Sequence, residues 1–189
     1  MKKNLLGIAL LFASVSAFAQ TWSLDKAHAK LGFDVTHLMV SNVEGSFKTF
    51  DVKVTASKDE FSDAVIELTA DANSIYTDND KRDAHLRSAD FFETEKYPTL
   101  TFKSTSFTKT SDKKYALVGN LTMHGVTKPV TLEATLNGTT VHPYSKKTIA
   151  GFKVTGVVKR SDFNVGKGTP VAVVSDEVNL NANLELIKD

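Results

Sequence analysis

The C-terminal segment of the chain alternates strictly between apolar and polar residues. The apolar residues are Val178, Leu180, Ala182, Leu184 and Leu186, and those between them are Asn179, Asn181, Asn183 and Glu185. A period of two places the apolar side chains on one face of a β-strand. A pairing shift of one residue would bury the three asparagines, so the register of this strand is strongly specified.

The same alternation recurs along most of the preceding chain, and short turn sequences interrupt it. Apolar faces are formed by Leu31, Phe33, Val35 and His37, by Val52 and Val54, by Ile66 and Leu68, by Leu100 and Phe102, by Tyr115, Leu117, Leu121 and Met123, and by Val130, Leu132, Ala134 and Leu136. Turns are predicted at residues 57–59, 111–113, 124–125 and 137–138. We therefore expect roughly eight antiparallel strands whose apolar faces are buried in a sandwich or a closed barrel. We favour the all-β, eight-stranded barrel, because closure removes exposed strand edges.

Two segments depart from the strand pattern. At residues 77–87, Thr77 followed three residues later by Asp80 is typical of a helix capping box. We predict a short helix near residues 78–90, inserted into the barrel. The glycine-containing residues 161–176 are longer than a hairpin turn and are predicted to form a rim or a lid.

The N-terminus is typical of an export signal. Two lysines precede an apolar run at residues 5–12, and an A-x-A cleavage site follows at residues 17–19. The run is shorter than the roughly 20 apolar residues of a permanent membrane span. We therefore expect residues 1–19 to be removed and residues 20–189 to form one domain in the periplasm, with secretion as an alternative.

Charge and composition argue against several classes of protein. Without Lys2 and Lys3, 21 basic residues face 22 acidic ones, so we expect no nucleic-acid partner. The chain has no cysteine, which excludes thiol catalysis and thiolate metal sites. The five histidines have no spacing of two or four residues that would pair metal ligands, and common catalytic and nucleotide-binding motifs are missing. We therefore expect no metal site, no cofactor and no enzyme activity.

Four segments together resemble the YceI-like family of bacterial periplasmic polyisoprenoid-binding proteins. They are residues 28–37 (HAKLGFDVTH) with residues 45–47 (GSF), residues 82–92 (RDAHLRSADFF) with residues 97–98 (YP), residues 119–130 (GNLTMHGVTKPV) and residues 160–164 (RSDFN). One departure is Ala29, where the family often has serine. The resemblance implies a lipocalin-like antiparallel barrel whose elongated tunnel holds the tail of a polyisoprenoid or similar amphiphile.

Two groups of ligand-binding residues are therefore expected. The tunnel is predicted to be lined by Leu31, Phe33, Val35, Val54, Leu68, Phe102, Leu117, Leu121, Phe152 and Val154. The headgroup is predicted to contact polar residues near the rim, namely His37, Asp83, His85, Arg87, Arg160 and Asp162. The alternative for Asp83, Arg87, Arg160 and Asp162 is a set of structural ion pairs that hold the helix and loop on the barrel.

These features predict a carrier or sequestering protein for a polyisoprenoid, quinone-like or fatty lipid. One alternative is a lipid-modifying enzyme that uses the same tunnel, with His37, Asp83 or His85 as acid or base. Another is an integral outer-membrane barrel, against which the asparagines on the polar face of the last strand argue. We therefore expect a protein that does not span the membrane. The sequence is compatible with a homodimer but does not determine the oligomeric state.

Overall fold

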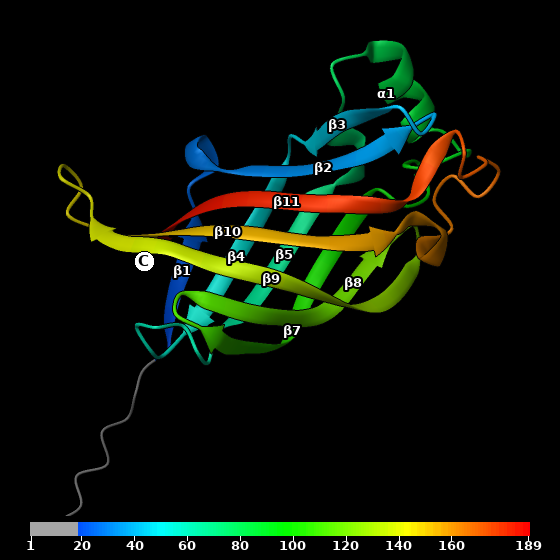
Figure 1. The fold of residues 1–189 in the computed structure, drawn as a ribbon. Helices are drawn as coiled ribbons and strands as arrows, with labels where there is room; N and C mark the ends of the chain where they lie inside the picture. The colour runs from blue at the N-terminus through cyan, green and yellow to red at the C-terminus, as the bar shows by residue number, and fades with distance from the viewer. Residues whose placement is uncertain (1–18) are drawn as a thin grey trace, which may run out of the picture.

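One antiparallel sheet of eleven strands winds around and closes on itself (Figure 1). The computed structural model describes residues 19–189, so the expected export signal lies outside the described residues except for its last position. The strands are β1 (Gln20–Leu24), β2 (Lys30–His37), β3 (Ser41–Phe47), β4 (Phe50–Ala56), β5 (Val65–Asp71), β6 (Ile75–Tyr76), β7 (Thr99–Ser111), β8 (Lys114–Met123), β9 (Val126–Val141), β10 (Thr148–Lys159) and β11 (Val174–Lys188).

These strands form an eight-stranded barrel in which three strands are each interrupted once. The ring runs β1, β4, β5, β7, β8, β9, β10 and β11, and pairing of β11 with β1 closes it. Beyond the interruptions, β2, β3 and β6 continue β1, β4 and β5, because β11 also pairs with β2, β2 with β3 and β3 with β6. The predicted eight-stranded lipocalin-like barrel is therefore confirmed.

Aspartate side chains stabilise two of the interruptions. Short 3-10 helices at Lys26–His28 and Ala72–Ser74 follow Asp25 and Asp71. Each aspartate accepts a hydrogen bond from the backbone N–H two residues later, at 3.0 and 2.9 Å respectively. The backbone groups freed by each break are thus partly satisfied within the break itself.

The barrel wall is open on one side, at the end that carries the helix. Within the described chain β6 pairs with β3 alone, and β7 pairs with β5 and β8. The segment between β6 and β7 contains helix α1 (Asp80–Arg87) and lies across this end of the barrel (Figure 1). The 3-10 helix at Arg160–Phe163 and the loop after it lie at the same end.

Helix α1 is shorter than predicted and has a different cap. It spans Asp80–Arg87 rather than residues 78–90, and its N-cap is Asn79. Thr77 was wrongly predicted as the cap, because its N–H and hydroxyl both donate to the carboxylate of Asp83 instead. Asn79 directly precedes the first helical residue, and its side chain, rather than that of Thr77, accepts a hydrogen bond from the backbone N–H of Arg82 in the first turn.

One predicted turn is also wrong. Strand β9 runs through Asn137 and Gly138 to Val141, and the hairpin turn comes after it. Gly138 pairs with Gly151, but the next pair joins Leu136 to Phe152, so Asn137 is an extra residue in β9. The Asn-Gly sequence therefore forms a β-bulge within the strand pair. The predicted turns at residues 111–113 and 124–125 are confirmed.

The end of the barrel away from α1 is filled by aromatic side chains, which we call the aromatic plug. Its members are Trp22, Phe61, Phe107, Tyr115 and Phe152, none more than 7 % exposed. The Phe61 ring lies 4.9 Å from Trp22 and 5.1 Å from Phe152 between centroids. The Tyr115 hydroxyl donates to the backbone carbonyl of Glu60 at 2.7 Å, so the plug is also tied to the loop below it.

Phe61 is the centre of the aromatic plug, and its removal should destabilise the barrel. Phe61→Ala leaves a cavity among rings that cannot collapse into it, so the free energy of unfolding should fall by about 3–5 kcal/mol. Urea denaturation followed by circular dichroism measures this change. Tyr144→Ala removes an aromatic side chain that is 90 % exposed and should change stability by less than about 0.5 kcal/mol. Equal effects of the two substitutions on the free energy of unfolding would contradict the conclusion that Phe61 packs in a plug that closes this end of the barrel.

Candidate functional site

The inward side chains of the barrel enclose a cavity of about 520 Å³ between the aromatic plug and the α1 end. This volume falls within the range of about 300–1,000 Å³ that is usual for small-molecule sites. Eight residues of the predicted tunnel line it: Leu31, Phe33, Val35, Leu68, Phe102, Leu117, Leu121 and Val154. Because the lining is mainly aliphatic and aromatic, the cavity suits an apolar chain rather than a polar metabolite.

Two residues of the predicted tunnel lie below this cavity. Val54 and Phe152 are almost completely buried and face a separate space of about 30 Å³ beside the aromatic plug. Strand parity correctly placed both side chains inside the barrel. Parity does not say how deep a residue lies along the barrel axis, and at this depth the plug fills the interior.

Irregular segments complete the cavity at the α1 end, which we call the mouth. Leu86 of α1, Phe91, Phe92 and Val165 all line it. Phe92 packs edge-to-face on Phe47 of β3, with 5.9 Å between ring centroids. Phe91 and Phe92 are not among the predicted tunnel residues. They reach the cavity because the segment between β6 and β7 lies across the end of the barrel.

The six predicted headgroup residues divide into two groups. His37 at the end of β2, His85 in α1 and Arg160 line the cavity. Asp83, Arg87 and Asp162 do not. Asp162 is exposed, whereas the other two are engaged by the barrel. Only the first group is placed where it could contact a ligand in the mouth.

Asp83 and Arg87 attach α1 to the barrel. The carboxylate of Asp83 is 2 % exposed and accepts both hydrogen bonds from Thr77 described above. Nε of Arg87 donates to the carbonyl of Asn73 at 2.8 Å, and Nη2 donates to that of Ile75 at 3.1 Å. Both side chains therefore have structural partners, although these are backbone groups and a hydroxyl rather than opposite charges.

Arg160 organises the loop between β10 and β11. Its side chain is buried, and each of its five N–H donors meets a backbone carbonyl. Nε donates to Ser175 at 3.1 Å, Nη1 to Val165 and Gly166 at 3.2 and 2.6 Å, and Nη2 to Thr169 and Val174 at 2.7 and 3.0 Å. Arg160 thus brings a positive charge to the mouth but keeps no donor for a headgroup.

Arg82 is a charged residue of the mouth that was not predicted from the sequence. It lines the cavity and is half-buried; Nε and Nη2 donate to the side chain and backbone of Thr77 at 2.7 and 2.6 Å. Its Nη1 makes no hydrogen bond within residues 19–189, so it retains donors for a ligand. Arg82 belongs to the segment of residues 82–92 that carries the family resemblance, which was the signal for it.

Glycines in the wall keep two phenylalanine rings out of the central space. A Cβ atom at Gly45 of β3 would lie 2.3 Å from Cζ of Phe33, and one at Gly119 of β8 would lie 2.3 Å from Cζ of Phe102. Each ring can therefore rest directly on the neighbouring backbone. A side chain at either position would force the ring to move. Because both rings line the cavity, the cavity is the space into which they would move.

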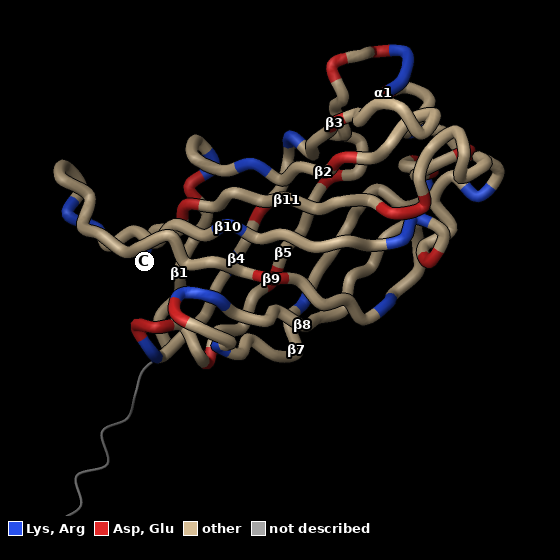
Figure 2. The backbone as a smooth tube through the Cα atoms, in the orientation of Figure 1, with Lys and Arg blue, Asp and Glu red and all other residues tan. Residues whose placement is uncertain are grey.

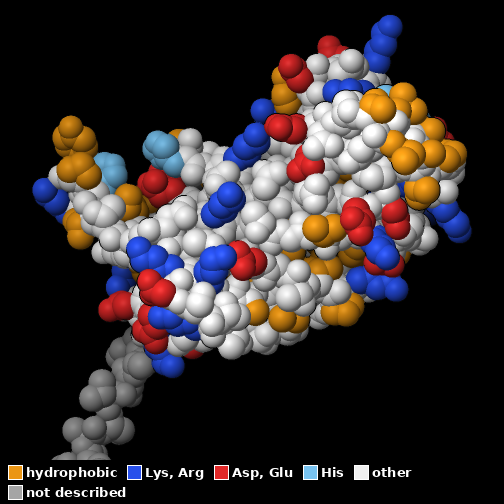
Figure 3. Space-filling model, in the orientation of Figure 1, with side chains coloured by type: hydrophobic (Ala, Val, Ile, Leu, Met, Phe, Trp, Pro, Cys, Tyr) orange, Lys and Arg blue, Asp and Glu red, His pale blue; other side chains and the backbone are white. Residues whose placement is uncertain are grey.

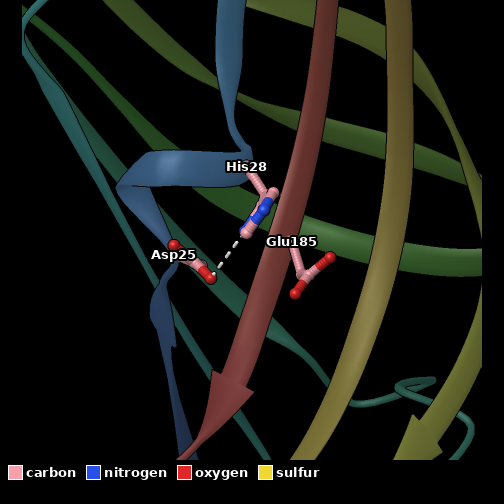
Figure 4. Close-up of side chains that lie close together, drawn as sticks. All are labelled: Asp25, His28 and Glu185. Carbon is pink, nitrogen blue, oxygen red and sulfur yellow. Dashed lines mark hydrogen bonds and ion pairs between the residues drawn. The ribbon is translucent and has the colours of Figure 1, made fainter. Parts of the chain in front are cut away.

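Three ionisable side chains also meet near the break between β1 and β2 (Figure 4). One ligand atom from each of Asp25, His28 and Glu185 lies within 4.8 Å of the others. Histidine spacing gave no reason to expect this group, which forms because the N–H of Asp25 bonds to the carbonyl of Glu185 at 2.8 Å. These residue types can bind Zn²⁺. The hydrogen bond that His28 Nδ1–H donates to Asp25 Oδ2, at 3.0 Å, raises the pKa of His28 and lowers that of Asp25.

A closed barrel with a sealed end, an apolar cavity and a mouth that carries polar side chains defines a lipocalin-like ligand-binding barrel. Residues 22–186 match the family model described as the YceI-like domain. Protein YceI of Salmonella newport (strain SL254) is 43 % identical over 190 residues, which cover 98 % of this chain and 97 % of that protein. The chain belongs to the YceI-like family.

Solved structures share the fold. The Campylobacter jejuni YceI protein is 36 % identical, with a TM-score of 0.74 over 88 % of this chain and 96 % of that one. A polyisoprenoid-binding domain from Saccharophagus degradans has a TM-score of 0.65 at 18 % identity, covering 89 % of this chain and 98 % of that one. Among the described residues, no helix has the length and apolar character needed to cross a bilayer.

Arg160→Ala should destabilise the protein, because five carbonyl groups lose their partner at once. We expect the free energy of unfolding to fall by about 2–4 kcal/mol, measured by urea denaturation. Arg160→Lys keeps the charge but supplies fewer donors in another geometry, so it should restore little of the loss. The exposed neighbour Asp162 gives the control Asp162→Ala, with no change. Wild-type stability of Arg160→Ala together with loss of lipid binding would instead identify Arg160 as a headgroup ligand.

The hydrogen bond between Asp25 and His28 predicts the direction in which the stability of the protein changes with pH. Because the folded-state pKa of His28 is raised, its contribution to stability is present below the ordinary histidine pKa of about 6.5 and is lost as the pH rises through the raised value. Asp25→Asn should lower the His28 pKa, measured by NMR titration of the ring protons. Glu185→Gln should lower it less, since Glu185 acts only through its charge. An unchanged pKa in Asp25→Asn would refute the pairing.

Proposed function

We propose that the protein is a carrier that holds one long-chain isoprenoid, quinone-like or fatty amphiphile with its tail in the cavity and its headgroup at the mouth. The observation that carries this proposal is the shape of the cavity: it is mainly apolar, it is sealed at one end by aromatic rings, and its histidine and arginine side chains lie near the other end. A slim tail fits such a space, and a polar group does not.

Burial of the tail supplies the affinity in this proposal. Each Å² of apolar surface removed from water contributes about 25 cal/mol, from which the costs of association and of ordering the chain are subtracted. At the mouth, Arg82 retains free donors and His37 and His85 add polar contacts. The positive charge of Arg160 favours an acidic headgroup. The name of the Saccharophagus degradans domain supports a polyisoprenoid as the tail.

We further propose that the carrier works in the periplasm. The N-terminal sequence has the charged, apolar and small-residue regions of an export signal in the right order. Strand β1 begins at Gln20, directly after the expected cleavage site, so removal of the preceding residues would leave the barrel intact. The absence of cysteine suits an oxidising compartment, because no thiol is present to form wrong disulfides.

The lipid-modifying enzyme remains the alternative function. The polar side chains that line the mouth include histidine, arginine and threonine, but no aspartate or glutamate side chain of the described residues lines the cavity. Of the three residues considered as acid or base, His37 and His85 line the cavity, whereas Asp83 is buried, accepts a hydrogen bond from Thr77 and does not line it. The carrier function needs none of these groups to transfer a proton, and we prefer it for that reason.

The carrier function can be tested directly on the protein as purified without detergent. Organic extraction and mass spectrometry should yield a long-chain amphiphile in about one-to-one ratio, or the empty protein should accept geranylgeraniol and melt at a higher temperature with it. Proton-transfer chemistry would appear in the same assay as a modified lipid. No extracted lipid, together with no change in melting temperature, would overturn the proposal.

The wall glycine at position 45 offers a sharper test. Gly45→Ala should push the Phe33 ring into the cavity and weaken geranylgeraniol binding about tenfold, since an obstruction of one methylene is worth about 1–3 kcal/mol. Geraniol is shorter and should be affected less. Gly138→Ala is the matched control, because a Cβ there meets nothing within 4 Å. Equal affinities of both variants would show that the ligand does not pass Phe33.

A further inference from the structure

The turn between β2 and β3 holds bulky apolar residues in a backbone conformation that they disfavour. Leu38 and Met39 have φ angles of 49° and 61°, in the left-handed region where asparagine and glycine are favoured. Their side chains and that of Val40 are 52, 77 and 83 % exposed, so they contribute little to the core. An Asn-Gly turn here would be more stable and more soluble. The three residues therefore call for an explanation outside folding.

A second exposed apolar segment lies against this turn. Residues 170–173 have the sequence Pro-Val-Ala-Val and are all exposed, with Val171 at 65 %. The N–H of Leu38 donates to the carbonyl of Val173 at 2.9 Å, so the two segments are hydrogen-bonded to one another. We call residues 38–40 and 170–173 the apolar tip.

The apolar tip carries no charge. Neither of its segments contains an acidic or basic residue, and the tube in Figure 2 is tan from the end of β2 into the start of β3. Hydrophobic side chains gather over the end of the molecule where β2 ends and β11 begins (Figure 3). Single exposed apolar residues are common on proteins, but a cluster formed by two adjoining loops marks an interaction surface.

The apolar tip is part of the edge of the mouth. His37, directly before it, and Val173, within it, both line the cavity. His37 also pairs with Val174 across β2 and β11, so the wall of the cavity and the exposed tip are one continuous structure. Arg160 holds the second segment in place through the carbonyls of Thr169 and Val174.

We propose that the apolar tip inserts into the surface of a lipid bilayer and so docks the mouth onto the membrane. This inference rests on the proposed carrier function, since a long-chain amphiphile resides in bilayers and would otherwise have to cross water with its tail exposed. Uncharged apolar side chains that project from two loops can enter the headgroup region without burying a charge. Continuity with the cavity places the opening at the membrane when they do.

Vesicle flotation tests the docking. The probe is a vesicle of phosphatidylethanolamine and phosphatidylglycerol, and the variant is Met39→Asn with Val171→Asn, one residue from each segment. Neither residue lines the cavity, and asparagine suits the backbone at position 39. We expect the variant to bind vesicles about tenfold or more weakly than the wild type, since insertion scales with buried apolar area. Circular dichroism and melting temperature verify that it folds.

The matched control removes apolar side chains at the opposite end of the barrel. Val141 and Tyr144 are 57 and 90 % exposed at the turn between β9 and β10 (Figure 1). Val141→Asn with Tyr144→Asn should float with vesicles as the wild type does. Equal losses in both double variants, or no vesicle binding by the wild type, would overturn the proposal. So would a wild-type dimer that the tip variant dissociates without any effect on vesicles, because the tip would then be a contact between copies.

A second measurement separates docking from the carrier function. Geranylgeraniol delivered from cyclodextrin reaches the cavity without a membrane, and it should raise the melting temperature of the wild type and of the tip variant equally. If vesicle binding depends on the tip but no lipid enters the cavity, the docking stands and the carrier function fails. If lipid enters the cavity of both proteins but the tip variant still floats like the wild type, only the docking fails.

Discussion

Backbone pairing by β11 holds the barrel closed, and the other features depend on it. One edge of β11 pairs with β10 over most of its length, and the other edge pairs first with β2 and then with β1. Between these two pairings, the N–H of Asp25 bonds to the carbonyl of Glu185, so the seam stays hydrogen-bonded across the break. Without this seam both sheet edges would be exposed and the interior would lose its wall. The cavity, the mouth and the apolar tip all lie along it.

Much of the fold could be predicted because alternate residues of a β-strand lie on the same face, so the sequence pattern shows which residues face the interior. Eight of the ten residues predicted for the tunnel line the cavity, and Leu31 through Val35 lie on the strand that was predicted for them. Val54 and Phe152 lie below the cavity, because alternation carries no information about depth along the barrel axis. The Asn137–Gly138 bulge was missed since the same dipeptide serves turns and bulges, and only the partner strand distinguishes them.

The mouth was harder to predict because its residues come from irregular segments. Arg160, Asp83 and Arg87 were all chosen as polar residues near the rim, but their hydrogen bonds are to backbone groups and a hydroxyl that no sequence pattern reveals. Arg82 was overlooked next to Asp83, although it is the one of the pair that lines the cavity. The group of Asp25, His28 and Glu185 depends on contact between residues far apart in the chain, so histidine spacing could not predict it.

The sealed end has a kinetic consequence. Because the aromatic plug leaves no exit beneath the cavity, a ligand must enter and leave through the same opening. An incoming molecule cannot displace the occupant from behind, so the rate of exchange is bounded by the departure of the first molecule. Substitutions at the mouth would then change mainly the residence time of the ligand, and its association rate less. In a barrel open at both ends, a second ligand could enter while the first leaves by the other end. In this barrel, the first ligand has to leave before the second can enter.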